Sequence, residues 1–234
     1  MKPSEKVILP RLVQVLLEPG AYEDNPASIE LIQTQMSFVF LTDQYVYKVK
    51  KPVDLGYVDY TSLEKRRYFC EREVELNKRL CPNTYLGVIP ITKDKHKIHV
   101  NGTGRIIEYA VKMRRLPKTR MMDILLTTDS LSPRMIDELA RRIAQFHSKA
   151  VTDPVISNNG SPEDVTMLIE NDFEESKHFI GNTITQEMYD RIRGWLHSFI
   201  DENLNLLKKR VENGSIKDCH GDLRVEHVCF VDSI

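Results

Sequence analysis

The sequence lacks the features that mark secreted, membrane-spanning and low-complexity proteins. Its 4 cysteines, at positions 70, 81, 219 and 229, form neither a C-x-x-C pair nor a dense framework, so we expect reduced thiols in a cytoplasmic protein. No stretch approaches the roughly 18 apolar residues of a membrane span. The N-terminus also lacks the small-residue cleavage site that ends a signal peptide. We find no internal repeat.

An excess of charge of either sign is missing as well. Lys and Arg number 33 against 34 Asp and Glu, which gives a formal net charge of −1. No global field therefore draws the chain to nucleic acid or to an anionic membrane, and we expect neither as a partner. The hydrophobic fraction of 41%, together with glycine, matches an ordinary globular protein. A bound polyanion would need a local cluster of basic side chains.

The apolar pattern changes between the two halves of the chain. Short runs rich in aromatic and β-branched residues predict strands at 29–32, 37–41, 45–50, 86–91, 97–100, 105–113 and 228–231. Helical patterns predict helices at 7–17, 61–80, 119–128, 133–150, 162–179 and 185–212. Strands that are largely separated from helices predict an α+β chain in two lobes. We place a strand-rich lobe over residues 1–112 and the first part of a helical lobe over 113–234.

A carboxylate interrupts the apolar stripe of the helix predicted over 61–80. Phe69, Leu76 and Leu80 follow the spacing i, i+7, i+11, and Glu73 occupies position i+4 of the same stripe. A carboxylate on a buried face is costly unless a cation meets it. The alternative is that the edge of the stripe is solvated and Glu73 points outward. Elsewhere on the helix, Arg66 and Arg67 are interpreted as an ordinary solvated face.

The nearest candidate cation lies on the strand predicted over 45–50. Alternation along that strand places Val46, Lys48 and Lys50 on one face. A lysine in such a pattern often lies on an edge strand, where it discourages aggregation. Next to a buried carboxylate, the same lysine becomes a fixed ammonium that can hold phosphate oxygens.

A second polar segment, His220-Gly-Asp-Leu-Arg-Val-Glu-His227, follows the long helix predicted over 185–212. Its position between a helix and a strand suits a catalytic loop. Two other interpretations remain open: a surface turn, or a transition-metal site in which His220, Asp222 and His227 are the ligands. The single tryptophan, Trp195, is interpreted as a core residue.

In combination these segments resemble the aminoglycoside phosphotransferase-like family of protein-kinase-like enzymes. The resemblance extends from about residue 15 to the end and is greatest with an uncharacterised bacterial branch that is sometimes fused to a P-loop ATPase-like domain. It rests on residues 46–53, 63–67, 73–77, 85–91 and 219–223. The resemblance implies a protein-kinase-like two-lobed fold, with a C-terminal lobe that looks truncated. It implies a phosphotransferase that moves the γ-phosphoryl group of ATP to a hydroxyl of an unknown small molecule.

The resemblance also implies roles for residues that would bind the nucleotide. Lys48 matches the lysine that binds the α- and β-phosphates, with Lys50 as the less favoured occupant, and Glu73 matches its ion-pair partner. Met113 falls where an inter-lobe hinge would contact adenine. Ser37 lies in the loop over residues 33–38 that would cover the phosphates, a loop that contains no glycine.

For the chemical step, the resemblance implies that Asp222 is the catalytic carboxylate and that His220 braces its loop. His227 occupies the place of a Mg²⁺-ligand asparagine, although imidazole is a poor substitute for a hard oxygen ligand. A second metal-binding aspartate is expected only after Ile234, so we expect a fragment or a truncated gene product. An inactive nucleotide-binding remnant is therefore the main alternative function, and a metal-dependent hydrolase is the third.

Overall fold

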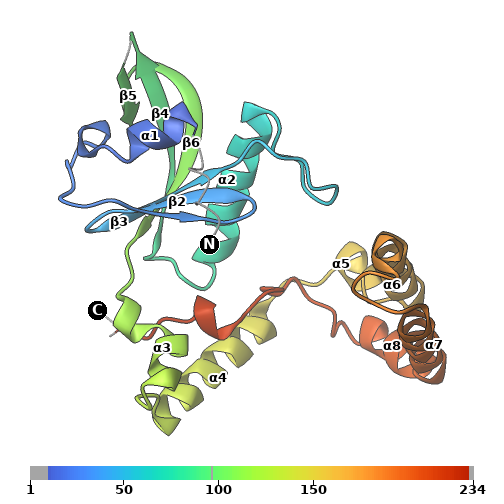
Figure 1. Ribbon diagram of the computed structural model, residues 1–234. Helices are drawn as coiled ribbons and strands as arrows, with labels where there is room; N and C mark the ends of the chain where they lie inside the picture. Colours follow the sequence, from blue (N-terminus) through green and yellow to red (C-terminus); the bar gives the residue numbers. More distant parts are fainter. Residues whose placement is uncertain (1–9, 96, 232–234) are drawn as a thin grey trace. The chain divides into compact units, whose positions relative to one another are not determined.

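The strand-rich half of the chain folds into an antiparallel sheet, as the alternation predicts. The computed structural model describes residues 10–95 and 97–231, and its strands follow the order β1-β2-β3-β6-β4-β5 in space (Figure 1). Their bounds are β1 Glu30–Gln33, β2 Ser37–Leu41, β3 Tyr45–Lys50, β4 Tyr85–Asp94, β5 Lys97–Val100 and β6 Arg105–Arg114. The strands predicted in the first half are all present, and β3 has the predicted bounds. Because β3 pairs with both β2 and β6, it is an interior strand.

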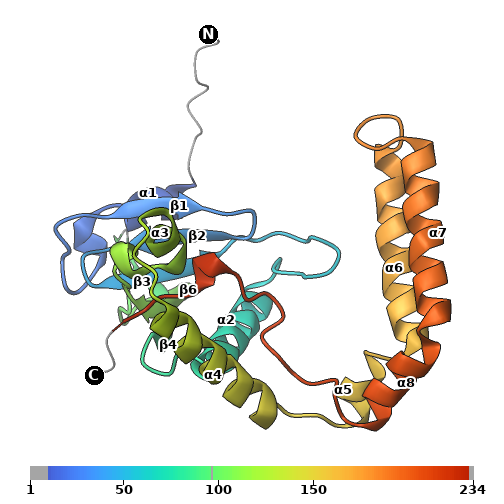
Figure 2. The same cartoon turned by 90° about the horizontal axis from the view of Figure 1, so that it is seen from below.

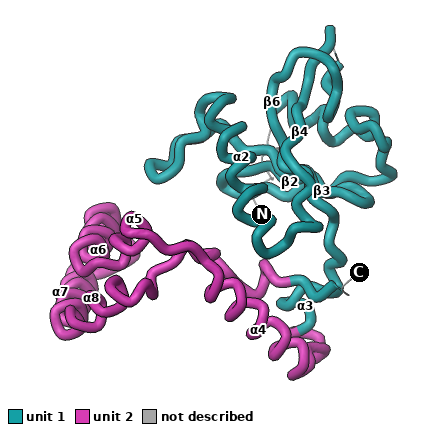
Figure 3. Tube along the Cα trace, turned by 180° about the vertical axis from the view of Figure 1, so that it is seen from behind, with its two compact units in different colours: residues 1–125, 229–234 teal, residues 126–228 magenta. Residues whose placement is uncertain are grey.

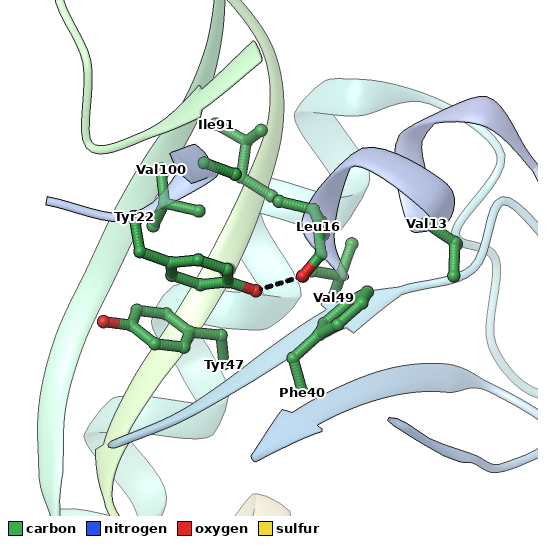
Figure 4. Packing of buried hydrophobic residues seen from close by; sticks show 10 residues of the cluster. Val13, Leu16, Tyr22, Phe40, Tyr47, Val49, Ile91 and Val100 are labelled. Carbon is green, nitrogen blue, oxygen red and sulfur yellow. Dashed lines mark hydrogen bonds between the residues drawn. The ribbon is translucent and has the colours of Figure 1, made fainter. Parts of the chain in front are cut away.

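Each face of the sheet is covered by different helices. The short helix α1 (Arg11–Leu16) and a 3-10 helix at Pro19–Ala21 cover one face, where their side chains pack against Phe40, Tyr47 and Val49 (Figure 4). The Tyr22 hydroxyl donates to the carbonyl of Leu16 at 2.7 Å. Residues 7–9 of the helix predicted over 7–17 lie outside the described residues. The long helix α2 (Leu63–Lys78) packs on the opposite face, over β4 and β6.

The start and the buried face of α2 differ from the prediction. Its N-cap is Ser62, whose hydroxyl accepts from the amide of Lys65 at 3.2 Å, so the helix begins at Leu63 and not at residue 61. The residues buried on the helix are Arg66, Cys70 and Val74, at the spacing i, i+4, i+8. The predicted apolar stripe is therefore displaced around the helix, because an arginine and not an aromatic residue enters the core.

Arg66 is buried because it meets a buried carboxylate on β6. Its Nε donates to both carboxylate oxygens of Glu108, at 3.0 and 2.8 Å. Its Nη1 donates to the carbonyls of Tyr60 and Thr61, at 2.8 and 3.0 Å. The prediction of a solvated face is therefore wrong for Arg66, whereas Arg67 is exposed. The guanidinium fixes the beginning of α2 and the loop before it to the sheet.

The other half of the chain is helical. Its helices are α3 Met122–Thr127, α4 Pro133–Lys149, α5 Pro154–Asn158, α6 Pro162–Ser176, α7 Gln186–Glu202 and α8 Leu204–Glu212. The short α5 was not predicted. The single helix predicted over 185–212 is two helices, because Asn203 leaves helical geometry with φ −111° and ψ 14°. The chain is therefore an α+β protein, as predicted, and among the described residues no helix is long and apolar enough to cross a membrane.

Helices α6 and α7 lie side by side in both views (Figures 1 and 2). The Tyr189 hydroxyl of α7 donates to the carbonyl of Phe173 on α6 at 3.0 Å, and the two rings meet edge to face. Trp195 does not take part in this core: it is 63% exposed and stacks on Phe199. The interpretation of Trp195 as a core residue is therefore wrong.

The chain divides into two units, one over residues 1–125 and 229–234 and the other over 126–228 (Figure 3). The first unit extends past the boundary predicted at 112/113. Two hydrogen bonds join distant segments of this unit: the amide of Phe230 donates to the carbonyl of Arg120, and Arg120 Nε donates to the carbonyl of Phe230. The strand predicted over 228–231 is reduced to an isolated bridge between Met121 and Cys229.

The buried position of Arg66 leads to a stability prediction. Arg66→Ala leaves the Glu108 carboxylate unpaired in the core and should lower the free energy of unfolding by about 3–5 kcal/mol. Arg72→Ala is the control on the same helix, because the 41% exposed side chain of Arg72 makes a surface pair with Glu75, which contributes about 0–1 kcal/mol. Urea denaturation followed by circular dichroism measures both. Equal losses in the two variants would contradict the role given to Arg66.

Candidate functional site

Lys48 and Lys50 lie on the face of β3 that is turned toward α2. In the register of the sheet, Lys48 is opposite Val39 on β2 and Val111 on β6, and Lys50 is opposite Ser37. Residues opposite each other in antiparallel strands share a face, and Val111 packs in the cluster below α2. The interpretation of Lys48 as an edge-strand lysine is wrong, because β3 is paired on both sides.

The two lysines meet on one carboxylate. Lys48 Nζ lies 2.8 Å from Glu73 Oε1, and Lys50 Nζ lies 2.7 Å from Glu73 Oε2. The Glu73 side chain is only 13% exposed. The predicted ion pair between Lys48 and Glu73 is therefore present, and the alternative in which Glu73 points into solvent is wrong. The second partner was not predicted: Lys50 was considered only as a substitute for Lys48.

Burial and charge act in opposite directions on this cluster. Burial disfavours ionisation of Glu73, but the ammonium groups of Lys48 and Lys50 outweigh it and hold the pKa of the carboxyl below its ordinary value. Burial likewise disfavours the charged form of Lys50, but Glu73 outweighs burial and raises the pKa of that lysine. Burial raises the pKa of the neighbouring Cys70 thiol to about 12. Near neutral pH the Glu73 carboxyl is therefore ionised, Lys50 is charged and the Cys70 thiol is neutral.

Ser37 and Met113 lie on the same face of the sheet as the two lysines. Ser37 begins β2 and is 2% exposed, and its amide donates to the hydroxyl of Thr34 at 2.9 Å. Met113 lies near the end of β6, opposite Val46, and packs half-buried against the residues of α2. The fold thus brings Ser37, Met113 and the lysines to one side of the sheet. Their roles toward a nucleotide stay predictions.

The His-Gly-Asp segment belongs to the second unit and is organised by its own contacts. His220 Nδ1 accepts from the amide of Asp222 at 3.3 Å, and Gly221 between them has φ +80°, a conformation that favours glycine. The Asp222 carboxylate is 69% exposed, and Arg224 Nε lies 3.2 Å from its Oδ1. Asp222 therefore presents a charged oxygen to solvent from a loop that His220 helps to shape.

The surroundings of His227 do not fit a Mg²⁺ ion. Its Nδ1 lies 2.7 Å from the carbonyl oxygen of Asp222, which can only accept, so this nitrogen carries the proton. Its Nε2 lies 3.2 Å from a guanidinium nitrogen of Arg224. Both ring nitrogens are thus engaged, and Mg²⁺ prefers oxygen ligands in any case. Within the described residues, no three His, Cys, Asp or Glu side chains are grouped so that they could hold a metal ion.

Comparisons with known proteins identify relatives but no activity. The chain is 26% identical over 204 residues to an uncharacterised protein of Mycobacterium bovis and to uncharacterised proteins of two Mycobacterium tuberculosis strains. Each match covers 87% of this chain but only 39% of the relative, so the chain spans well under half the length of these relatives. No family model matches the chain, and no solved structure matches it.

The lowered pKa of Glu73 predicts a pH-dependent contribution to stability. Because the folded-state pKa lies below the ordinary value of 4.5, the contribution is complete above that value and is lost as the pH falls through the lowered pKa. Glu73→Gln should therefore lower the free energy of unfolding by about 2–4 kcal/mol near pH 7. The difference from the wild type should shrink as the pH falls below 4.5 and through the lowered pKa of Glu73.

Urea denaturation across this pH range measures the effect. Glu75→Gln is the matched control, because Glu75 lies on the same helix with a 66% exposed side chain, and its substitution should change little at any pH. A constant difference between the wild type and Glu73→Gln from neutral to acid pH would show that the Glu73 charge is not responsible.

Proposed function

We propose that this chain contains the nucleotide-binding and catalytic segments of a phosphotransferase with a protein-kinase-like two-lobed fold. Its substrates would be ATP and a small molecule that carries a hydroxyl group. The observation that carries the proposal is the ion pair between Lys48 and Glu73, on an interior strand and the helix that follows it. A cytoplasmic location, expected from the cysteine content, belongs to the same proposal.

The order of the elements supports the proposed fold. Helix α2 is inserted between β3 and β4 of an antiparallel sheet, and a helical unit that carries the His-Gly-Asp loop follows the sheet. This is the layout expected from the resemblance to aminoglycoside phosphotransferase-like enzymes. The helix is also held to the sheet at two points: Arg66 pairs with Glu108 on β6, and Glu73 pairs with Lys48 on β3. Such anchoring suits a site in which phosphate positioning governs the rate.

Lys48 has the properties that a phosphate-binding lysine needs. Its side chain is 33% exposed, whereas that of Lys50 is 5% exposed, so a ligand has more access to Lys48 than to Lys50. Hydrogen bonds between an ammonium and a phosphate oxygen are charge-assisted and short. Glu73 holds the ammonium in one place before the nucleotide arrives, which reduces the entropy lost on binding. In this role Lys48 would bind the phosphate oxygens in both the ground state and the transition state.

Asp222 is the group that would act on the acceptor. Its exposed carboxylate can accept a hydrogen bond from the incoming hydroxyl and orient the oxygen toward the γ-phosphorus. It can receive the hydroxyl proton as the new P–O bond forms and the bond from the γ-phosphorus to the leaving ADP oxygen breaks. The hydrogen bond from the Asp222 amide to His220 holds the backbone of the loop. We derive no step through Mg²⁺, because the surroundings of His227 do not fit that ion.

A nucleotide-binding protein without transfer activity is the second candidate. It is favoured by His227, which stands where the resemblance requires a metal ligand but has both ring nitrogens engaged. The two candidates agree on Lys48 and Glu73 and differ only at the second unit. A binding experiment therefore tests what they share, and a transfer experiment separates them.

ATP binding is the first test of the proposal. Lys48→Met should raise the dissociation constant for ATP by roughly 10- to 100-fold, because a charge-assisted hydrogen bond to the phosphates is lost. Lys112→Met is the control: Lys112 lies on the neighbouring strand β6, and its ammonium stacks 4.0 Å from the ring centroid of Tyr45. Isothermal titration calorimetry measures both. Unchanged affinity in Lys48→Met would remove the lysine from the nucleotide site.

Transfer of the phosphoryl group is the second test. Asp222→Asn should abolish the formation of ADP that depends on a hydroxyl acceptor and should change ATP affinity less than threefold, because Asp222 acts on the acceptor. Glu226→Gln in the same loop is the control and should retain activity. Wild-type protein that binds ATP but transfers nothing to a panel of amino sugars and polyols would favour the second candidate.

A further inference from the structure

One carboxylate shared by two ammonium groups leaves a surplus of positive charge inside the first unit. Lys48 and Lys50 each contact one oxygen of Glu73. The nearby buried carboxylate of Glu108 is already occupied by Arg66, at 2.8 Å. Within the described residues, neither lysine forms an ion pair with another acid. A partly buried cluster with net charge of one sign attracts an ion of the opposite sign.

The two lysines differ in their access to solvent. The side chain of Lys50 is 5% exposed, and its ammonium lies 4.9 Å from the ring centroid of Tyr60, which covers it. The side chain of Lys48 is 33% exposed. A ligand can therefore approach the ammonium of Lys48, whereas the ammonium of Lys50 is enclosed between Glu73 and an aromatic ring.

We propose that the two lysines have separate roles, in which Lys50 is a positioning residue that stays on Glu73 and Lys48 is the exchangeable cation that turns to a ligand phosphate. This inference rests on the proposed function and deepens it. With a single lysine, moving the ammonium toward a phosphate would weaken the only pair of a buried carboxylate, which is costly. With Lys50 in place, Glu73 remains paired, so Lys48 can be shared with or transferred to the ligand at little cost.

The melting temperatures of single and double variants test the role of Lys50 without any ligand. Lys50→Met should lower the melting temperature by about 10 °C, and Lys48→Met by no more than about 3 °C. Adding Glu73→Gln to Lys50→Met should cause less loss than the sum of the single effects, because both substitutions break the same ion pair. Lys50→Arg keeps the charge and should restore most of the stability. Equal losses in Lys48→Met and Lys50→Met would overturn the division of roles.

Nuclear magnetic resonance of the lysine side chains tests the exchange in the wild-type protein, so it does not depend on the folding of any methionine variant. Lys48→Arg and Lys50→Arg assign the two signals, and inorganic pyrophosphate and ATP are the probes. Either probe should shift the Lys48 signal and leave the Lys50 signal in place. Movement of the Lys50 signal with a constant Lys48 signal would reverse the assignment and overturn the inference.

The outcomes separate this inference from the proposed function. A shift of Lys48 with pyrophosphate, together with no ATP binding or transfer, supports the exchangeable lysine and rejects the phosphotransferase. Binding of neither probe rejects both the phosphotransferase and the exchange of Lys48. The melting temperatures decide the anchoring role of Lys50 in either case. Lys112→Met should leave the pyrophosphate titration unchanged, and a loss of binding in that variant would also overturn the inference.

Discussion

The carboxylate of Glu73, held between two ammonium groups, is the interaction on which the first unit depends. It joins α2 to β3, which is an interior strand, and it does so from a position that is almost closed to water. A charge in such a place is stable only if its partners are fixed in geometry. Lys50 meets that condition, because its ammonium is enclosed between Glu73 and the ring of Tyr60. The pleat of β3 presents Lys48 to the same helix.

A second buried pair complements the first. Arg66 and Glu108 fix the beginning of α2 to β6, while Glu73 fixes its middle to β3. Buried ion pairs add little net stability compared with apolar packing of the same volume, but breaking one is costly. Their effect here is to select one placement of the helix on the sheet. The placement of α2 positions Glu73, which in turn orients Lys48. The Arg66–Glu108 pair therefore supports the candidate site on β3.

The second unit contributes chemistry of a different kind. Its His-Gly-Asp loop is exposed and is shaped by contacts among neighbours, from His220 to His227. Charged groups in such an exposed loop are accessible to a ligand, but water weakens their electrostatic interactions. The charged groups around Glu73 are instead preorganised where little water reaches them. The mycobacterial relatives are considerably longer than this chain. The proposed function assigns ATP to the first set of residues and the acceptor to the second.

The sequence by itself determined the α+β class, because strand patterns and helix patterns are largely separated along the chain. The bounds of β3 and the shared face of Lys48 and Lys50 follow from alternation along a single segment. The sequence also indicated the pair between Lys48 and Glu73. Only the tertiary structure decided which lysine is enclosed. It also decided that Arg66 enters the core, because the burial of a side chain depends on which other segments pack against it. The ring of Tyr60 covers the ammonium of Lys50, and the carboxylate of Glu108 on β6 pairs with the buried guanidinium of Arg66. Neither neighbour can be inferred from local periodicity, since Tyr60 lies in the loop after β3 and Glu108 lies 42 positions from Arg66.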